Sequence, residues 1–168
     1  IIAQTLDSHA KVIKHESKRY NQKADGISLL QKEGQEFNGI IKYLTDNTGG
    51  NIHNNGTIEI TSNSYYTGDH PSNLLDFNEK SKYETPRKDA WICFDFKNMK
   101  VKLTSYSLKS SKGESSSCYL KSWNMEVSND GKNWTMIDHH SDCTTLNGDG
   151  FVGTFNVQEN DFSRYVRL

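Results

Sequence analysis

Short segments in which apolar and polar residues alternate constrain the fold of this chain more than any other feature. Between 91 and 96, Ile92, Phe94 and Phe96 lie two residues apart, as side chains on one face of a β-strand do. Seven such segments follow one another after residue 50, separated by clusters of Gly, Ser, Asn and Asp. They span 57–62, 91–96, 101–108, 119–127, 134–137, 151–157 and 164–168. The pattern predicts an antiparallel β-sandwich for residues 46–168.

The first 45 residues follow a different pattern, in which small and large apolar residues recur every seven positions. No Pro interrupts them, and the small set precedes the large set by three residues, as in the seam of a coiled coil or helix hairpin. The two sets are Ala3, Ala10, Ser17 and Ala24, and Leu6, Ile13, Tyr20 and Ile27. We therefore predict a helical segment over 1–45. It either forms a homo-oligomer or docks a partner through residues 3–30, or it folds onto its own domain or serves as a solvated linker.

The stretch from Met125 to Trp134, MEVSNDGKNW, predicts a hairpin in the middle of the β region. Asn129-Asp130-Gly131 is a strong turn signal, because Gly accepts positive φ and Asn and Asp tolerate it. We expect Trp134 to re-enter the sheet as a core or edge anchor. Asp95 lies within a predicted strand, where an Arg near the end of the chain is a suitable structural partner.

In this order, HPSNLLDFNEKSKYET, WICFDFKNMKVKLTSYSLKS, LKSWNMEVSNDGKNW and RYVRL make the β region resemble the discoidin domain. This family is also called coagulation-factor type C. The resemblance implies a galactose-binding-like jelly roll preceded by the helical segment. Members usually continue past the Arg-Leu strand with one more strand. The sequence ends at Leu168, so we expect that strand to be missing and an edge to need cover, for which the helical half is the candidate.

The resemblance also implies that ligands bind at one end of the barrel through protruding loops, here 62–73, 80–89 and 110–118. The first two loops carry Tyr65, Tyr66, His70, Tyr83 and Arg87. Aromatic rings beside His and Arg donors suit a sugar, and exposed aromatic residues equally suit a protein partner. The alternative is that Tyr65 and Tyr83 pack under their own loops. Lipid-binding members present bulky apolar residues at the loop tips, which these loops lack, so a membrane ligand is not expected.

Metal and catalytic sites find little support in the sequence. Some family members hold a structural Ca²⁺, for which Asp76 and Asn78 are weak candidate ligands, and no other cofactor is expected. Catalytic motifs such as Gly-x-Ser-x-Gly and His-Glu-x-x-His are absent from the sequence, so we predict that the chain is not an enzyme. The segment 137–143, IDHHSDC, we interpret as a solvated loop between strands.

Charge and cysteine content narrow the function further. Twenty basic and 21 acidic residues leave a net charge of −1, which does not favour a nucleic-acid partner. The three cysteines, Cys93, Cys118 and Cys143, form no CxxC pair, and we expect reduced thiols, with one disulfide and a free thiol as the alternative.

Two functions fit these observations. The first is a protein-interaction module of a cytoplasmic adaptor, because the sequence resembles discoidin copies attached to BTB-type adaptor proteins. The alternative is an extracellular, lectin-like adhesion module that binds galactose-type glycans through its loops.

Overall fold

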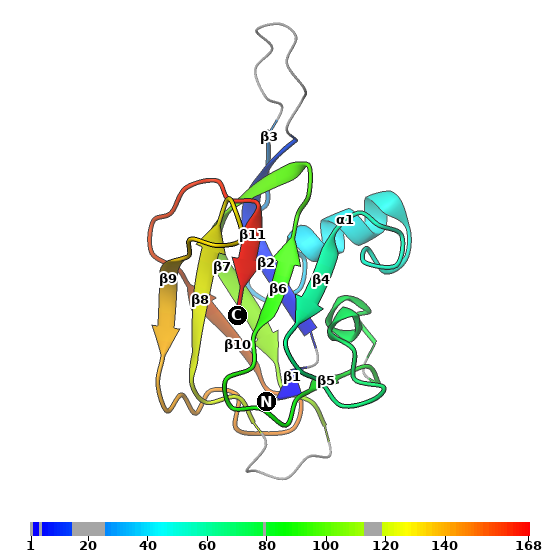
Figure 1. Cartoon of the computed structure of the whole chain (residues 1–168), viewed down its shortest axis with the longest axis vertical. Helices are drawn as coiled ribbons and strands as arrows, with labels where there is room; N and C mark the ends of the chain where they lie inside the picture. The colour runs from blue at the N-terminus through cyan, green and yellow to red at the C-terminus, as the bar shows by residue number, and fades with distance from the viewer. Residues whose placement is uncertain (1, 4, 15–25, 79, 113–118) are drawn as a thin grey trace, which may run out of the picture.

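The computed structural model describes residues 1–168 except 1, 4, 15–25, 79 and 113–118. The described part contains eleven strands, one α-helix and one 3-10 helix (Figure 1). The strands are β1 (Ile2–Ala3), β2 (Thr5–Lys14), β3 (Gly26–Ser28), β4 (Glu59–Ser62), β5 (Tyr83–Glu84), β6 (Ile92–Asp95), β7 (Met99–Lys109), β8 (Trp123–Ser128), β9 (Thr135–His140), β10 (Val152–Asn156) and β11 (Tyr165–Arg167). The helices are α1 (Ile40–Thr48) and the 3-10 helix η1 (Pro71–Leu75).

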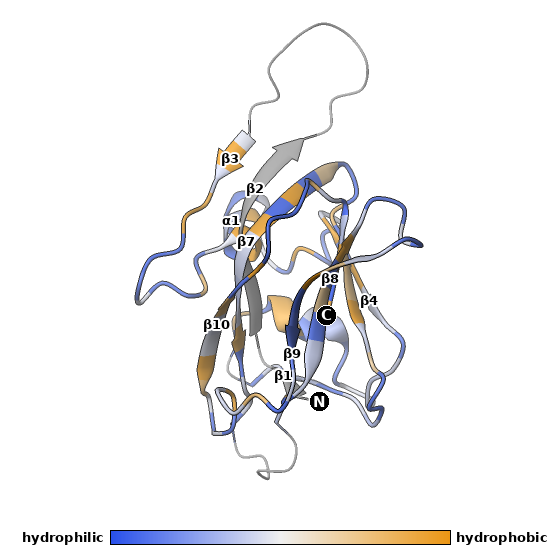
Figure 2. Cartoon of the chain, turned by 90° about the vertical axis from the view of Figure 1, so that its left-hand side faces the viewer, coloured by the Kyte–Doolittle hydropathy of each residue, from blue (hydrophilic) through white to orange (hydrophobic). Residues whose placement is uncertain are grey.

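Two antiparallel sheets form the body of the protein. The five-stranded sheet has the order β4-β6-β11-β8-β9, and the four-stranded sheet has the order β10-β7-β2-β3. Figure 2 shows them as two layers, with β10, β7 and β2 in one and β9, β8 and β4 in the other. Each of the seven alternating segments overlaps one strand of the two sheets, so the predicted β-sandwich is confirmed. A separate two-stranded ladder pairs β1 with β5.

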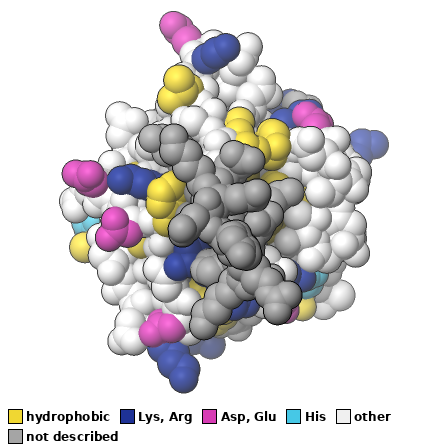
Figure 3. Space-filling view, turned by 90° about the horizontal axis from the view of Figure 1, so that it is seen from above, with side chains coloured by type: hydrophobic (Ala, Val, Ile, Leu, Met, Phe, Trp, Pro, Cys, Tyr) yellow, Lys and Arg dark blue, Asp and Glu magenta, His cyan; other side chains and the backbone are white. Residues whose placement is uncertain are grey.

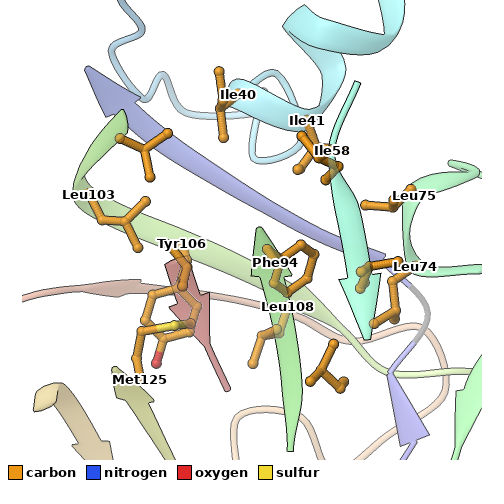
Figure 4. Packing of buried hydrophobic residues seen from close by; sticks show 14 of the residues in the cluster. Ile40, Ile41, Ile58, Leu74, Leu75, Phe94, Leu103, Tyr106, Leu108 and Met125 are labelled. Atoms are coloured by element: carbon orange, nitrogen blue, oxygen red, sulfur yellow. The ribbon is translucent and has the colours of Figure 1, made fainter. Parts of the chain in front are cut away.

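The core lies between the two sheets and beneath α1 (Figure 4). Alternation along β6 and β8 turns Phe94 and Met125 inward, where they are 2% and 1% exposed. From α1, Ile40, Ile41 and Leu44 join the same cluster, since Leu44 lies three and four residues after the two Ile and such positions share one helix face. Burying an aliphatic or aromatic side chain of this size contributes about 1.5–3 kcal/mol. The helix therefore belongs to the core of the sandwich.

The prediction of a helical segment over 1–45 is wrong for most of its described residues. Thr5–Lys14 form β2, which pairs with β7 from Thr5↔Lys109 to Lys14↔Met99, and β3 pairs on the other edge of β2. Among the described residues of this segment, helix begins at Ile40, and the expected boundary after residue 45 falls inside α1. The coiled-coil seam is thereby excluded for β2, and positions 15–25 lie outside the described residues. Residues 5–14 form a strand because pairing with β7 covers an edge that would otherwise be unpaired, and this tertiary contact outweighs the local helix propensity.

The predicted hairpin and ion pair are both present. β8 and β9 are paired, and Gly131 in the turn between them has φ 70°. Arg164 binds Asp95 through two hydrogen bonds of 2.7 Å each. Trp134 is half-buried on the outer face of the five-stranded sheet, where the guanidinium carbon of Arg167 lies 3.9 Å from the centroid of its indole ring. It is therefore an edge anchor and lies outside the core cluster.

The surface shows no concentration of one sign of charge on the face seen in Figure 3. Basic and acidic side chains of the described residues alternate around its rim. Where the chain is described, no helix combines the length and the apolar character that crossing a bilayer requires.

Candidate functional site

The two predicted ligand loops, 62–73 and 80–89, lie against each other at one end of the sandwich. The Asn63 side-chain amide donates to the Asp89 carbonyl (3.1 Å), and the Tyr66 amide donates to the Glu84 carbonyl (3.0 Å). The described start of the third loop contacts the residue before β10, where the Ser110 amide donates to the Phe151 carbonyl (2.9 Å). The structure thus brings the first two loops together.

Tyr65, Tyr66 and His70 form the exposed tip of the first loop. Tyr65 and Tyr66 are 45% and 48% exposed. The centroids of the Tyr65 and His70 rings lie 5.1 Å apart in a T-shaped arrangement. The His70 Nδ1 accepts from the Ser72 amide (3.1 Å) and so caps η1, which fixes the ring. Burial, and secondarily the neighbouring His53, lower the pKa of His70. The imidazole is therefore mainly a structural cap, beside two accessible tyrosines.

Tyr83 and Arg87 are committed to the fold of the loops. The Tyr83 side chain is 0% exposed, and its hydroxyl donates to the Ser64 carbonyl (2.7 Å). Burial raises the pKa of this phenol. The Arg87 guanidinium binds Asp89 in the same loop at 2.9 and 2.6 Å. Tyr83 therefore packs under its loop, which is the alternative that the sequence left open, and Arg87 is already paired.

The candidate calcium ligands are engaged in local hydrogen bonds. One Asp76 carboxylate oxygen accepts from the Asn51 amide and the other from the Ser81 hydroxyl (3.2 Å). The Asn78 carbonyl oxygen accepts from the Lys80 backbone amide (3.0 Å). Among the described residues, no three His, Cys, Asp or Glu side chains gather closely enough to hold a metal ion. Asp76 and Asn78 thus take part in the hydrogen bonds that hold their loop, and calcium binding stays a prediction of the sequence.

A pocket of about 460 Å³ opens at the same end of the five-stranded sheet, where β6 begins and β11 ends. The loop 80–89 borders it through Lys88, and the backbone amide of Trp91 is held by the Asn63 side chain at 2.9 Å. Side chains on the outer face of the sheet form one wall, and more buried residues form the floor. The wall consists of Trp91, Asn124, Glu126, His139 and Arg167, and the floor includes Tyr83, Leu120, Trp123 and His140. We call this cavity the outer-face pocket.

Two polar pairs fix the wall of the outer-face pocket. The Nε and Nη2 atoms of Arg167 both bind Oε2 of Glu126, at 2.8 and 2.7 Å. The Nδ1 of His139 donates to Oδ1 of Asn124 at 2.7 Å. Strand register explains both pairs, since Arg167 lies opposite Glu126 and Asn124 opposite His139. The pairs leave Glu126 Oε1 and the Asn124 amide NH₂ available to a ligand.

A buried hydrogen-bond chain supports the floor of the pocket. The rings of His140 and Trp123 stack at 4.5 Å, and the His140 Nε2 donates to Asp138 at 2.9 Å. The Tyr106 hydroxyl donates to the same carboxylate oxygen of Asp138 at 2.6 Å. Burial and the adjacent carboxylate raise the pKa of Tyr106 well above its usual value. His140 is therefore held in one orientation.

Sequence reasoning missed most of this pocket. The segment 137–143 was expected to be a loop, but its residues through His140 belong to β9. That expectation is wrong because β9 pairs with β8 as far as His140↔Trp123. Alternation did not predict this part of the strand, because Ile137 is the one buried residue of β9 and three polar residues, Asp138, His139 and His140, follow it. The length of β8 was the available signal, because a hairpin partner is usually of matching length.

Comparisons with known proteins agree with this architecture. The model of the F5/8 type C domain family matches residues 59–168. Among solved structures, CpGH89CBM32-5 from Clostridium perfringens, in complex with GalNAc-β-1,3-galactose, shares 15% identity at a TM-score of 0.52, over 67% of this chain and 82% of that chain. The family 32 CBM of C. perfringens NanJ, in complex with galactose, shares 13% identity at 0.52, over 67% and 80%.

A third structural neighbour comes from another organism. The C-terminal domain of a chitobiase from Bacteroides fragilis shares 20% identity at a TM-score of 0.53, over 66% of this chain and 78% of that chain. At these identities the neighbours establish the fold, a galactose-binding-like jelly roll, and leave the ligand to the residues of this chain.

Proposed function

Because the chain belongs to the F5/8 type C domain family, we propose that it is a glycan-binding module that holds a pyranose sugar in the outer-face pocket. The family and the neighbouring modules are non-catalytic, in agreement with the prediction that this chain is not an enzyme. The proposal takes the alternative that the sequence offered, glycan recognition. It moves the site from the tip of the first loop to the pocket beside the second.

The observation that carries the proposal is an aromatic ring beside two polar pairs. Each pair is held in place and keeps a hydrogen-bonding group without a partner among the described residues. The Trp91 ring lines the pocket and stacks on no other ring among the described residues. A free indole face suits the apolar C–H face of a pyranose. Opposite it, the Asn124 amide supplies donors and Glu126 Oε1 supplies an acceptor, which together match neighbouring sugar hydroxyls.

Pre-organisation favours this site over the tyrosines of the first loop. Both polar pairs of the pocket lie on strands, and each is held by a second side chain, so little conformational entropy is lost when a ligand binds. Tyr65 and Tyr66 are exposed on a loop, and the adjacent His70 uses Nδ1 to cap η1. A protein partner and a cytoplasmic adaptor stay predictions of the sequence.

Galactose titration followed by calorimetry or NMR tests the proposal, after a glycan array has ranked the ligands. We expect wild type to bind and Trp91→Ala to weaken affinity about tenfold, or about 1.4 kcal/mol, because the stacking platform is lost. Tyr65→Ala is the matched control, an aromatic truncation outside the pocket, and is expected to bind like wild type.

Two results would contradict the proposal. If wild type binds no sugar on the array, glycan recognition is wrong. If Tyr65→Ala abolishes binding and Trp91→Ala does not, the sugar binds at the tip of the first loop and the pocket is not the site.

A further inference from the structure

The outer-face pocket carries an unbalanced positive charge. Among the side chains that line it are two permanent cations, Lys88 and Arg167, and a single carboxylate, Glu126. The other titratable groups at its wall and floor are His139, His140 and the fully buried phenol of Tyr83. The lining side chains therefore hold one more permanent cation than carboxylate.

The geometry assigns this unbalanced charge to Lys88. Two nitrogens of Arg167 bind Glu126, so these two charges neutralise each other. The carboxylate nearest to Lys88 in sequence, Asp89, is bound by two nitrogens of Arg87. Within the described part of the chain, Lys88 forms no salt bridge, and it is exposed at the rim of the pocket.

We propose that the sugar bound in the outer-face pocket carries an anionic substituent, a carboxylate or a sulfate, which Lys88 pairs with. This inference rests on the proposed function and adds the chemical class of the ligand. The neutral polar groups of the wall take the ring hydroxyls, while the ammonium group at the rim takes the charge. An exposed ion pair contributes modestly, so the selectivity for an acidic sugar is about threefold to fivefold.

The test compares three sugars that differ in one substituent: galactose, galacturonic acid and galactose 6-sulfate. Affinities are measured by calorimetry at about pH 8, where an ordinary imidazole is neutral, and at low salt. Wild type should prefer at least one of the two acidic sugars about threefold to fivefold, and Lys88→Met should abolish that preference, measured as the ratio of its affinities for the acidic sugar and for galactose. Lys132→Met, the same charge change in the hairpin turn away from the pocket, should keep the preference.

The outcomes distinguish a failure of this inference from a failure of the proposed function on which it rests. The acidic sugar that is preferred identifies the substituent as carboxylate or sulfate. Equal affinity for all three sugars, or a preference that survives in Lys88→Met, overturns the inference and leaves glycan binding intact. Failure of all three sugars to bind, together with a silent glycan array, overturns the proposed function itself. Raising the salt to about 0.5 M should shrink the preference and leave galactose affinity unchanged.

Discussion

The indole Nε1 of Trp123 donates a 2.6 Å hydrogen bond to the hydroxyl oxygen of Tyr106, which joins the two sheets of the sandwich through its interior. Trp123 begins β8 of the five-stranded sheet, and Tyr106 lies in β7 of the four-stranded sheet. The Tyr106 hydroxyl in turn donates a hydrogen bond to Asp138, which also accepts one from His140 at the floor of the pocket. The core and the candidate site therefore share one polar network.

Tyr106→Phe should destabilise the protein by about 1–3 kcal/mol, because the buried Trp123 Nε1 loses its acceptor. The measurement is the free energy of unfolding in urea. Tyr66→Phe removes a hydroxyl from a ring that is 48% exposed and should change it by less than about 0.5 kcal/mol. Equal stability of Tyr106→Phe and wild type would show that the hydrogen bond contributes nothing net.

Acid should weaken the fold through Asp95. Burial alone would raise the pKa of this carboxyl, but the hydrogen bonds from Arg164 and from the Lys97 backbone amide outweigh it, so the pKa lies below its usual value. A depressed folded pKa contributes stability above the unfolded pKa, about 3.9, which is lost as pH falls through the folded value. Unfolding free energies from pH 6 to 2 should therefore fall less steeply for Asp95→Asn. Parallel curves for the two proteins would assign the acid sensitivity to other groups.

Gly131→Ala should cost about 1 kcal/mol of unfolding free energy, since Gly131 has φ 70° and an Ala is strained there. Crowding is not the cause, because an added Cβ would lie 3.6 Å from the Tyr165 ring, an ordinary contact. Gly131→Asn is the matched variant: Asn tolerates this backbone region and should recover part of the loss. If Asn costs as much as Ala, strain at φ is not the reason.

The Cys93 thiol should resist alkylation in the native protein at pH 8. Burial raises its pKa to about 11, with the Arg167 guanidinium opposing the shift, so little thiolate is present. Mass spectrometry after brief treatment with iodoacetamide should find Cys93 unmodified in buffer and modified in urea. Similar rates in both conditions would show that the thiol is accessible.

Cys93 and Cys143 are both free thiols, as the sequence predicted, and Cys118 lies outside the described residues.

The N-terminal segment shows where sequence periodicity is ambiguous. Leu6 and Ala10 belong to the seven-residue grid expected of a helix, but together with Val12 they are also spaced by even numbers, which fits one face of a strand. In the structure Leu6 lies opposite Leu108 and Val12 opposite Val101, two residues that are 1% and 0% exposed. Pairing with the free edge of β7 favours the strand over the helix, and β7 is about ninety residues away along the chain.

The sequence by itself determined the class of the fold. Strand alternation and turn residues act over a few neighbours, so the seven strands from β4 to β11, apart from β5, and the turn at Gly131 were predictable. Only the tertiary structure decided which polar residues meet. Trp91, Asn124, His139 and Arg167 come from four strands or their ends, and strand register alone brings them to one pocket. A register shift of one residue would turn each of these side chains to the opposite face. The alternation within a strand indicates which side chains share a face, but it does not indicate which strand lies beside it, and the order β4-β6-β11-β8-β9 does not follow the sequence.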